Sequence, residues 1–179
     1  MVPDKMINNI KLVCFYGPES TGKSCMAKKL AENYKTEFVP EVARELITSN
    51  DFTREDIIMI GRAQTERIFQ KARKANKILF CDTDLITTQI YSRHYLKVVP
   101  PILYELEKMV EYDLYFLFDI DVPWVHDVLR DIGEEKRREE MYEIFRSELE
   151  RRNISYIKVE GDWEEREKTI VKEIAKLMK

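Results

Sequence analysis

The segment Gly17 to Ser24, Gly-Pro-Glu-Ser-Thr-Gly-Lys-Ser, matches the spacing GxxxxGK(S/T) and constrains the fold more than any other part of the chain. It follows an apolar run rich in branched and aromatic residues, Ile10 to Tyr16. Apolar residues then recur at helical spacing, at Ala27, Leu30, Ala31 and Tyr34. A glycine-rich turn without function is the alternative, but the order strand, loop, helix favours a phosphate-binding loop.

The chemistry of such a loop assigns roles to its residues. Glycines let backbone N–H groups turn toward nucleotide phosphates, and the N-terminus of the next helix adds partial positive charge. We expect Lys23 to reach the β- and γ-phosphates as a catalytic residue, and the Ser24 hydroxyl to ligate Mg²⁺. ATP and Mg²⁺ are the predicted cofactors, with GTP left open. The expected nucleotide-binding residues are Gly17, Glu19, Ser20, Thr21, Gly22, Lys23, Ser24 and Cys25.

Composition argues for one domain, residues 1–179, because 44% of 179 residues are hydrophobic and no stretch resembles a linker. No apolar segment is long enough to span a bilayer and no signal peptide is evident, so we expect a cytoplasmic protein without a membrane partner. The formal net charge of −3, with both signs interspersed, predicts no nucleic-acid partner. The odd number of cysteines, Cys14, Cys25 and Cys81, predicts free thiols. The oligomeric state is left open.

Strand-like runs alternate with helical patterns along the whole chain. This alternation predicts an α/β fold with a mainly parallel sheet, helices on both faces, and ligands at the carboxyl ends of the strands. The predicted helices are one from Thr53, as the cap, to Ala75, one from Leu85 to Tyr95, one starting at Pro100-Pro101, and one at the C-terminus. The predicted strands are residues 10–16, 36–39, 77–81, 114–118 and 154–159.

Asp82 and Asp84 follow the third predicted strand, at the edge where the phosphate-binding loop opens. We expect Asp82 to bind Mg²⁺ and to orient or deprotonate a substrate hydroxyl. An aspartate in this place can instead cap the next helix, and this alternative is stronger for Asp84. Asp84 and Thr87 are nevertheless predicted to contact the substrate.

Glu41 and Arg44 follow the second predicted strand. They lie three residues apart, so on a helical turn they share one face and can form a local ion pair. The functional alternative is that the carboxylate accepts hydrogen bonds from substrate hydroxyls while the guanidinium steadies it or contacts a phosphate.

The segment of about residues 123–140 is predicted to be a lid that carries cations over the γ-phosphate. For residues 134–140 the alternative is a solvated helix face. Pro123 is expected to start a helix that aims Trp124 toward the ligand, with a core tryptophan as the alternative. The loop Glu160 to Trp163 is expected to border the adenine base.

Taken together, these motifs resemble the ribosylnicotinamide kinase domain of the NadR family over nearly the whole chain. The run Asp82-Thr83-Asp84-Leu85-Ile86-Thr87-Thr88-Gln89 is the discriminating motif, beside the phosphate-binding loop, the segment Glu41 to Arg44, and Pro123-Trp124-Val125 through Arg130. The resemblance implies a nucleoside-monophosphate-kinase-like P-loop NTPase fold with five strands in the order 2-3-1-4-5. It also implies phosphorylation of nicotinamide riboside at its 5′-hydroxyl by ATP, giving nicotinamide mononucleotide.

The resemblance further implies that Trp124 stacks on the nicotinamide ring and that Asp127 and Arg130 belong to the substrate-side lid. Arg130 and Arg137 are then the predicted catalytic arginines of the lid. The chain departs from the family by having Val128 where members often have glycine, which removes backbone freedom. It also lacks room for the additional domains of the best-known members, so we expect a stand-alone kinase. A kinase for another nucleoside or small alcohol, and a non-catalytic nucleotide sensor, are the rival hypotheses.

Overall fold

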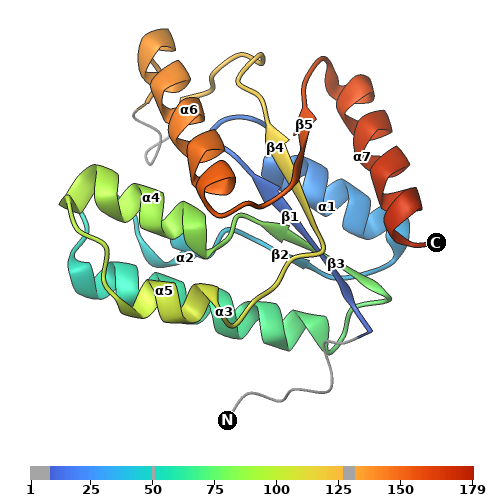
Figure 1. Cartoon of the computed structure of the whole chain (residues 1–179), viewed down its shortest axis with the longest axis horizontal. Coiled ribbons are helices and arrows are strands. Elements are labelled where there is room, and N and C mark those ends of the chain that lie inside the picture. The colour runs from blue at the N-terminus through green and yellow to red at the C-terminus, as the bar shows by residue number, and fades with distance from the viewer. Residues whose placement is uncertain (1–8, 50, 127–131) are drawn as a thin grey trace.

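The computed structural model describes residues 9–49, 51–126 and 132–179, which form one parallel sheet covered by helices (Figure 1). The strand order is β2-β3-β1-β4-β5, as the family resemblance implied, and every pairing is parallel. The strands are β1 Lys11–Tyr16, β2 Phe38–Val39, β3 Ile78–Asp82, β4 Leu114–Phe118 and β5 Tyr156–Val159. The helices are α1 Lys23–Tyr34, α2 Ala43–Leu46, α3 Arg54–Ala72, α4 Leu85–Leu96, α5 Ile102–Glu107, α6 Glu135–Arg151 and α7 Trp163–Leu177.

Alternating side chains of the strands form a separate core on each face of the sheet. Val13 and Phe15 face α1 and α7, where they pack with Phe80, Phe116 and Phe118 from neighbouring strands. Cys14 and Tyr16 face the opposite side and pack against α4 and α6, and α3 covers the β2–β3 half of that same side. Because both faces are buried, the strands are continuous apolar runs.

Two helix starts follow directly from the sequence. Thr53 caps α3 in a capping box with Asp56, and Asp84 caps α4 by accepting a hydrogen bond from the Thr87 N–H at 2.9 Å. The inner face of α3 includes Gly61, Gln64 and Thr65, which are buried, while the apolar Ala63 and Phe69 lie half-buried. Tertiary packing against α4 and α5 therefore admits polar and small residues that a hydrophobic pattern does not reveal.

The predicted helix at Pro123 is wrong for the described part of the segment. Residues 119–126 and 132–134 contain no helix, and α6 begins only at Glu135. Arg138 donates to the carbonyl oxygen of Val122 at 3.0 Å, and the Trp124 ring lies against Gly133. Contacts of Val122 and Trp124 with Arg138 and Gly133 hold the chain here, and local helix signals cannot predict such contacts.

The loop after β1 begins with a close backbone approach at Gly17. Its φ is 134°, and a Cβ there would lie 2.9 Å from the carbonyl oxygen of Phe118 in β4. Only glycine meets both conditions, since an L-residue is strained at this φ and backbone cannot move aside easily.

We predict that Gly17→Ala lowers the free energy of unfolding by about 1–3 kcal/mol, because it combines the strained φ with the clash against Phe118. Chemical denaturation measures this difference. Lys77→Gly is the matched control, because Lys77 has a positive φ of 65° far from the loop. This substitution should change the free energy of unfolding by no more than about 1 kcal/mol. Equal stability of Gly17→Ala and wild type would contradict the prediction.

Candidate functional site

The loop between β1 and α1 encloses the side chain of Lys23. The ammonium donates to the carbonyl oxygen of Pro18 at 2.5 Å and to the Thr21 hydroxyl at 3.2 Å, and the Thr21 hydroxyl donates to the same carbonyl at 3.0 Å. Burial lowers the pKa of Lys23, while the charges of Asp82 and Glu41 oppose that shift. The cation is thus held at the mouth of the loop, where a bound phosphate would replace the carbonyl as its partner.

Asp82, the last residue of β3, accepts a hydrogen bond from the Ser24 hydroxyl at the start of α1. Its side chain is 1% exposed, and its other oxygen, Oδ1, is buried without a hydrogen-bond partner in the described structure. Burial, followed by the nearby charge of Glu41, raises the pKa of Asp82 to about 6, although Lys23 and Ser24 lower it. The structure therefore brings together both residues predicted to hold Mg²⁺.

This pair fits a magnesium site of the kind that nucleotide-binding loops use. Mg²⁺ prefers oxygen ligands and takes few from the protein, because phosphates and waters supply the others. A hydroxyl and an unsatisfied carboxylate oxygen match that preference. Within residues 9–49, 51–126 and 132–179, no group of three or more His, Cys, Asp or Glu could hold a metal alone. A metal here would consequently need the nucleotide's oxygens as well.

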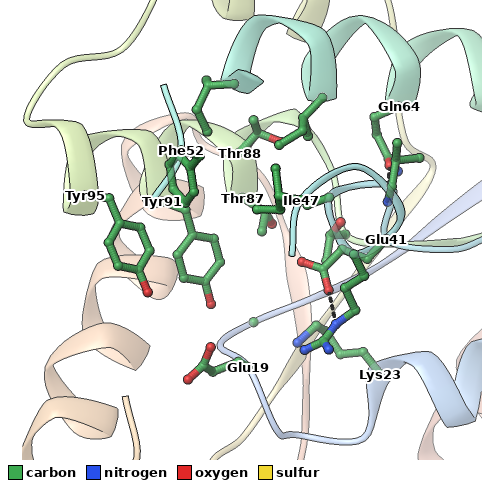
Figure 2. Close-up of a pocket in the computed structure, with 17 residues that line it drawn as sticks. Glu19, Lys23, Glu41, Ile47, Phe52, Gln64, Thr87, Thr88, Tyr91 and Tyr95 are labelled. Atoms are coloured by element: carbon green, nitrogen blue, oxygen red, sulfur yellow. Dashed lines mark hydrogen bonds and ion pairs between the residues drawn. The ribbon is translucent and has the colours of Figure 1, made fainter. Parts of the chain in front are cut away.

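Two cavities meet at the mouth of the loop. The first is lined by loop residues from Glu19 to Cys25 together with Glu41 and Arg44, and its volume is about 360 Å³ including space open to solvent. The second, about 780 Å³ including space open to solvent, extends from Gly17 and Lys23 between α2, α3 and α4 (Figure 2). Glu19, Lys23, Glu41 and Arg44 line both cavities. The site thus consists of a smaller cavity at the phosphate-binding loop and a larger cavity lined by both apolar and polar residues.

Glu41 and Arg44 stand where the two cavities join. Arg44 Nε donates to Glu41 Oε2 at 3.0 Å, so the local ion pair that the sequence left as an alternative is present. Both side chains remain partly exposed, at 23% for Glu41 and 34% for Arg44. Because both residues line both cavities, a local ion pair and a contact with a ligand are compatible interpretations.

Asp84 has the capping role rather than a place on the cavity wall. Its Oδ1 accepts from the Thr87 N–H and hydroxyl, both at 2.9 Å, and its Oδ2 accepts from the Tyr115 hydroxyl at 3.0 Å. Its side chain is 1% exposed, so a substrate contact would require breaking these bonds. Thr87 does line the larger cavity. Asp84 thus orients α4, and Thr87 is the member of this pair that a substrate can meet.

Neither Trp124 nor Arg137 lines either cavity. The predicted lid nevertheless contacts the loop, because the Val125 N–H donates to the Ser20 hydroxyl at 2.7 Å and the Ile132 N–H donates to Glu19 Oε1 at 3.0 Å. Trp124 packs against Gly133 and lies 5.5 Å from the His126 ring, centroid to centroid, and Arg137 is exposed on the first turn of α6. Residues 134–137, 139 and 140 are exposed, as expected for the solvated helix face. Asp127, Val128 and Arg130 lie outside the described residues. The catalytic and stacking roles of this segment stay predictions.

One side of the larger cavity is lined by aromatic residues that the sequence analysis did not select. Tyr91 and Tyr95 stand one turn apart on α4, with ring centroids 6.3 Å apart and planes at 19°, and Phe52 packs edge-on to Tyr95 at 5.2 Å. Figure 2 shows the two tyrosines with their hydroxyls toward Glu19. The signal was available: Thr87, Tyr91 and Tyr95 recur every four residues after the Asp84 cap.

Comparison with known proteins agrees with this geometry. A family model described as an AAA domain matches residues 12–166. The chain belongs to this family of P-loop NTPases. It is also 32% identical over 161 residues to the trifunctional NAD biosynthesis/regulator protein NadR of Escherichia coli K12, covering 86% of this chain and 39% of NadR. The resemblance to NadR is thereby confirmed, although the chain spans about two fifths of the length of the relative it matches.

Solved structures show the same fold. A NadR protein in complex with NR superposes with a TM-score of 0.74 at 22% identity, over 88% of this chain and 46% of the other. Deoxyadenosine kinase from M. mycoides gives a TM-score of 0.64 at 11% identity, over 92% and 99% of the two chains. The nucleoside-kinase-like architecture is thus confirmed. Among the described residues, no helix has the length and apolar character to cross a membrane.

We predict that Asp82→Asn makes the metal-free protein more stable than wild type at pH 7, by about 1–3 kcal/mol. The pKa of Asp82 is raised from 3.8 to about 6, so its ionisation opposes folding. Protonated Asp82 contributes its full share to the free energy of unfolding of the wild type below pH 3.8. That contribution is lost as the pH rises through the folded-state pKa of about 6. The difference between variant and wild type should therefore shrink toward zero near pH 4, in denaturation series with EDTA.

Asp56 provides a control of opposite sign. Hydrogen bonds from the Thr53 backbone and hydroxyl lower the pKa of Asp56, so ionised Asp56 favours the fold at neutral pH. Asp56→Asn should consequently be less stable than wild type at pH 7, with a difference that fades at acid pH. A stability gain for Asp82→Asn that did not change between pH 4 and 7 would contradict the assignment.

Proposed function

We propose that this chain is an ATP-dependent kinase that phosphorylates the 5′-hydroxyl of nicotinamide riboside, giving nicotinamide mononucleotide for NAD synthesis. The observation that carries the proposal is the junction of two cavities at Lys23 and Glu41, one lined by the phosphate-binding loop and one ending in tyrosines. Transfer of a phosphoryl group requires donor and acceptor to meet at one point, in line. The likeness to NadR supports nicotinamide riboside as the acceptor.

The larger cavity suits a nucleoside with a flat base. Tyr91, Tyr95 and Phe52 offer aromatic surface on one side of it, where a base would stack. Glu41, Arg44 and Thr87 offer hydrogen-bonding groups nearer the loop, where a ribose would lie. This assignment proposes the tyrosines of α4 for stacking because they line the cavity, whereas the stacking role of Trp124 stays a prediction.

In the proposed reaction, the protein acts mainly by positioning and by stabilising charge. Lys23 would exchange its contact with Pro18 for the transferred phosphoryl group. Ser24 and Asp82 would hold Mg²⁺, which would supply Lewis-acid stabilisation of the phosphate oxygens. Because the Asp82 carboxylate is 1% exposed and bonded to Ser24, Glu41 is the carboxylate better placed to accept the acceptor's hydroxyl proton.

The direct test is ADP release by the purified chain with ATP and Mg²⁺, comparing nicotinamide riboside, a panel of other nucleosides, and no acceptor. We predict turnover that depends on nicotinamide riboside. Turnover only with another nucleoside would keep the mechanism and replace the substrate. Slow hydrolysis that is the same with and without acceptor would contradict a kinase and favour the non-catalytic sensor.

Tyr95→Ala tests the stacking end of the cavity. Stacking of a base on an aromatic side chain contributes about 1–3 kcal/mol, so we predict that KM for the acceptor rises by at least about fivefold while KM for ATP stays unchanged. Tyr104→Ala is the control, because Tyr104 is an exposed tyrosine on α5 that does not line the cavity. An unchanged acceptor KM in Tyr95→Ala would place the base elsewhere.

A further inference from the structure

Arg166, on the first turn of α7, is a buried cation outside the two cavities. Its side chain is 1% exposed, and its guanidinium lies 5.8 Å from the centre of the Phe118 ring. Burying a guanidinium is costly unless all its polar groups find partners. The partners of Arg166 come from three separate segments, which indicates that it joins them.

The guanidinium of Arg166 makes four polar contacts. Its Nε donates to the carbonyl oxygen of Gly161 at 2.8 Å, and its NH2 nitrogen donates to the carbonyl oxygen of Asp119 at 3.2 Å. The same NH2 nitrogen pairs with the Asp121 carboxylate, which also accepts the Gly161 N–H. The fourth contact leaves this group of loops: the NH1 nitrogen donates to the carbonyl oxygen of Thr21 at 2.9 Å, inside the phosphate-binding loop.

The contact with the Thr21 carbonyl oxygen orients the peptide group that joins Thr21 to Gly22. A trans peptide is planar, so its N–H points away from its C=O. Because Arg166 holds the Thr21 carbonyl toward α7, the N–H of Gly22 faces the opposite side. Gly22 lines the smaller cavity, where the phosphates of a nucleotide would bind.

A second residue of the same turn contacts the same peptide. A Cβ placed on Gly22 would lie 3.3 Å from the Trp163 ring, so the indole packs closely against Gly22. Gly22 has a φ of 88°, a conformation that glycine adopts readily. The first turn of α7 therefore braces both halves of the Thr21–Gly22 peptide, by a hydrogen bond on one side and by packing on the other.

We propose that Arg166 is a positioning residue for nucleotide binding: by fixing the Thr21 carbonyl, it directs the Gly22 N–H into the phosphate cavity and pre-organises the loop. This role concerns nucleotide binding, and it rests on the proposed function of the chain as an ATP-dependent kinase. It depends on the planar fork of the guanidinium, which can reach several carbonyls at once, and a lysine ammonium cannot reproduce this geometry.

The test is the dissociation constant of MgAMP-PNP for Arg166→Met and Arg166→Lys, measured by calorimetry on variants whose fold is verified by circular dichroism and thermal unfolding. We expect both variants to bind at least about tenfold more weakly than wild type. KM for the acceptor should stay within about twofold, because the acceptor cavity is not touched. The binding measurement needs no acceptor, so it stands apart from failure of the proposed riboside kinase activity.

Arg152→Met is the matched control. Arg152 is also a largely buried arginine, paired with Glu107 and Glu148 and bonded to Gln89, but it lies among α4, α5 and α6 away from the loop. Its loss should lower thermal stability without changing the affinity for MgAMP-PNP. Wild-type affinity in folded Arg166→Met would overturn the proposal. Full recovery of affinity in Arg166→Lys would also overturn it, because charge alone would then suffice.

Discussion

The parallel pairing of β1 with β3 is the interaction on which the site depends. It aligns Phe15 with Asp82, and the Thr83 N–H donates to the Phe15 carbonyl oxygen at 2.9 Å just beyond the strands. Because parallel strands end at the same edge of a sheet, the aspartate meets the start of the helix that follows β1. A contact between Ser24 and Asp82, residues 58 positions apart, is thus a consequence of strand register.

Much of the fold could be predicted from the sequence because its signals are local and repeated. Apolar runs located all five strands, and Thr53 and Asp84 marked two helix starts through their capping side chains. The loop motif similarly located Lys23 and Ser24, since its spacing has one well-defined backbone solution. The order of the strands came from the family resemblance, because periodicity alone does not determine it.

The rest depends on side-chain directions and on contacts between distant segments. Pro123 is a sound local signal for a helix start, yet the described residues after it form no helix. The Val125 N–H donates to the Ser20 hydroxyl, and Arg138 donates to the carbonyl oxygen of Val122, just before the proline. Asp82 and Asp84 look alike in sequence, but one carboxylate has an unsatisfied oxygen and the other accepts three hydrogen bonds. In the sequence, Arg166 is one of many charged residues on an amphipathic helix, and no local sequence pattern indicates that it is buried.

Only one of the three cysteines is accessible to a thiol-directed reagent. Cys14 and Cys81 are enclosed in the central strands, whereas Cys25 is exposed and lines the phosphate-side cavity immediately after Ser24. A thiol-directed reagent would thus meet the native protein at one position, and that position adjoins the magnesium and phosphate sites proposed above. Occupancy of the loop and alkylation of this thiol compete for the same space, so protection from labelling would report nucleotide binding without any measurement of turnover.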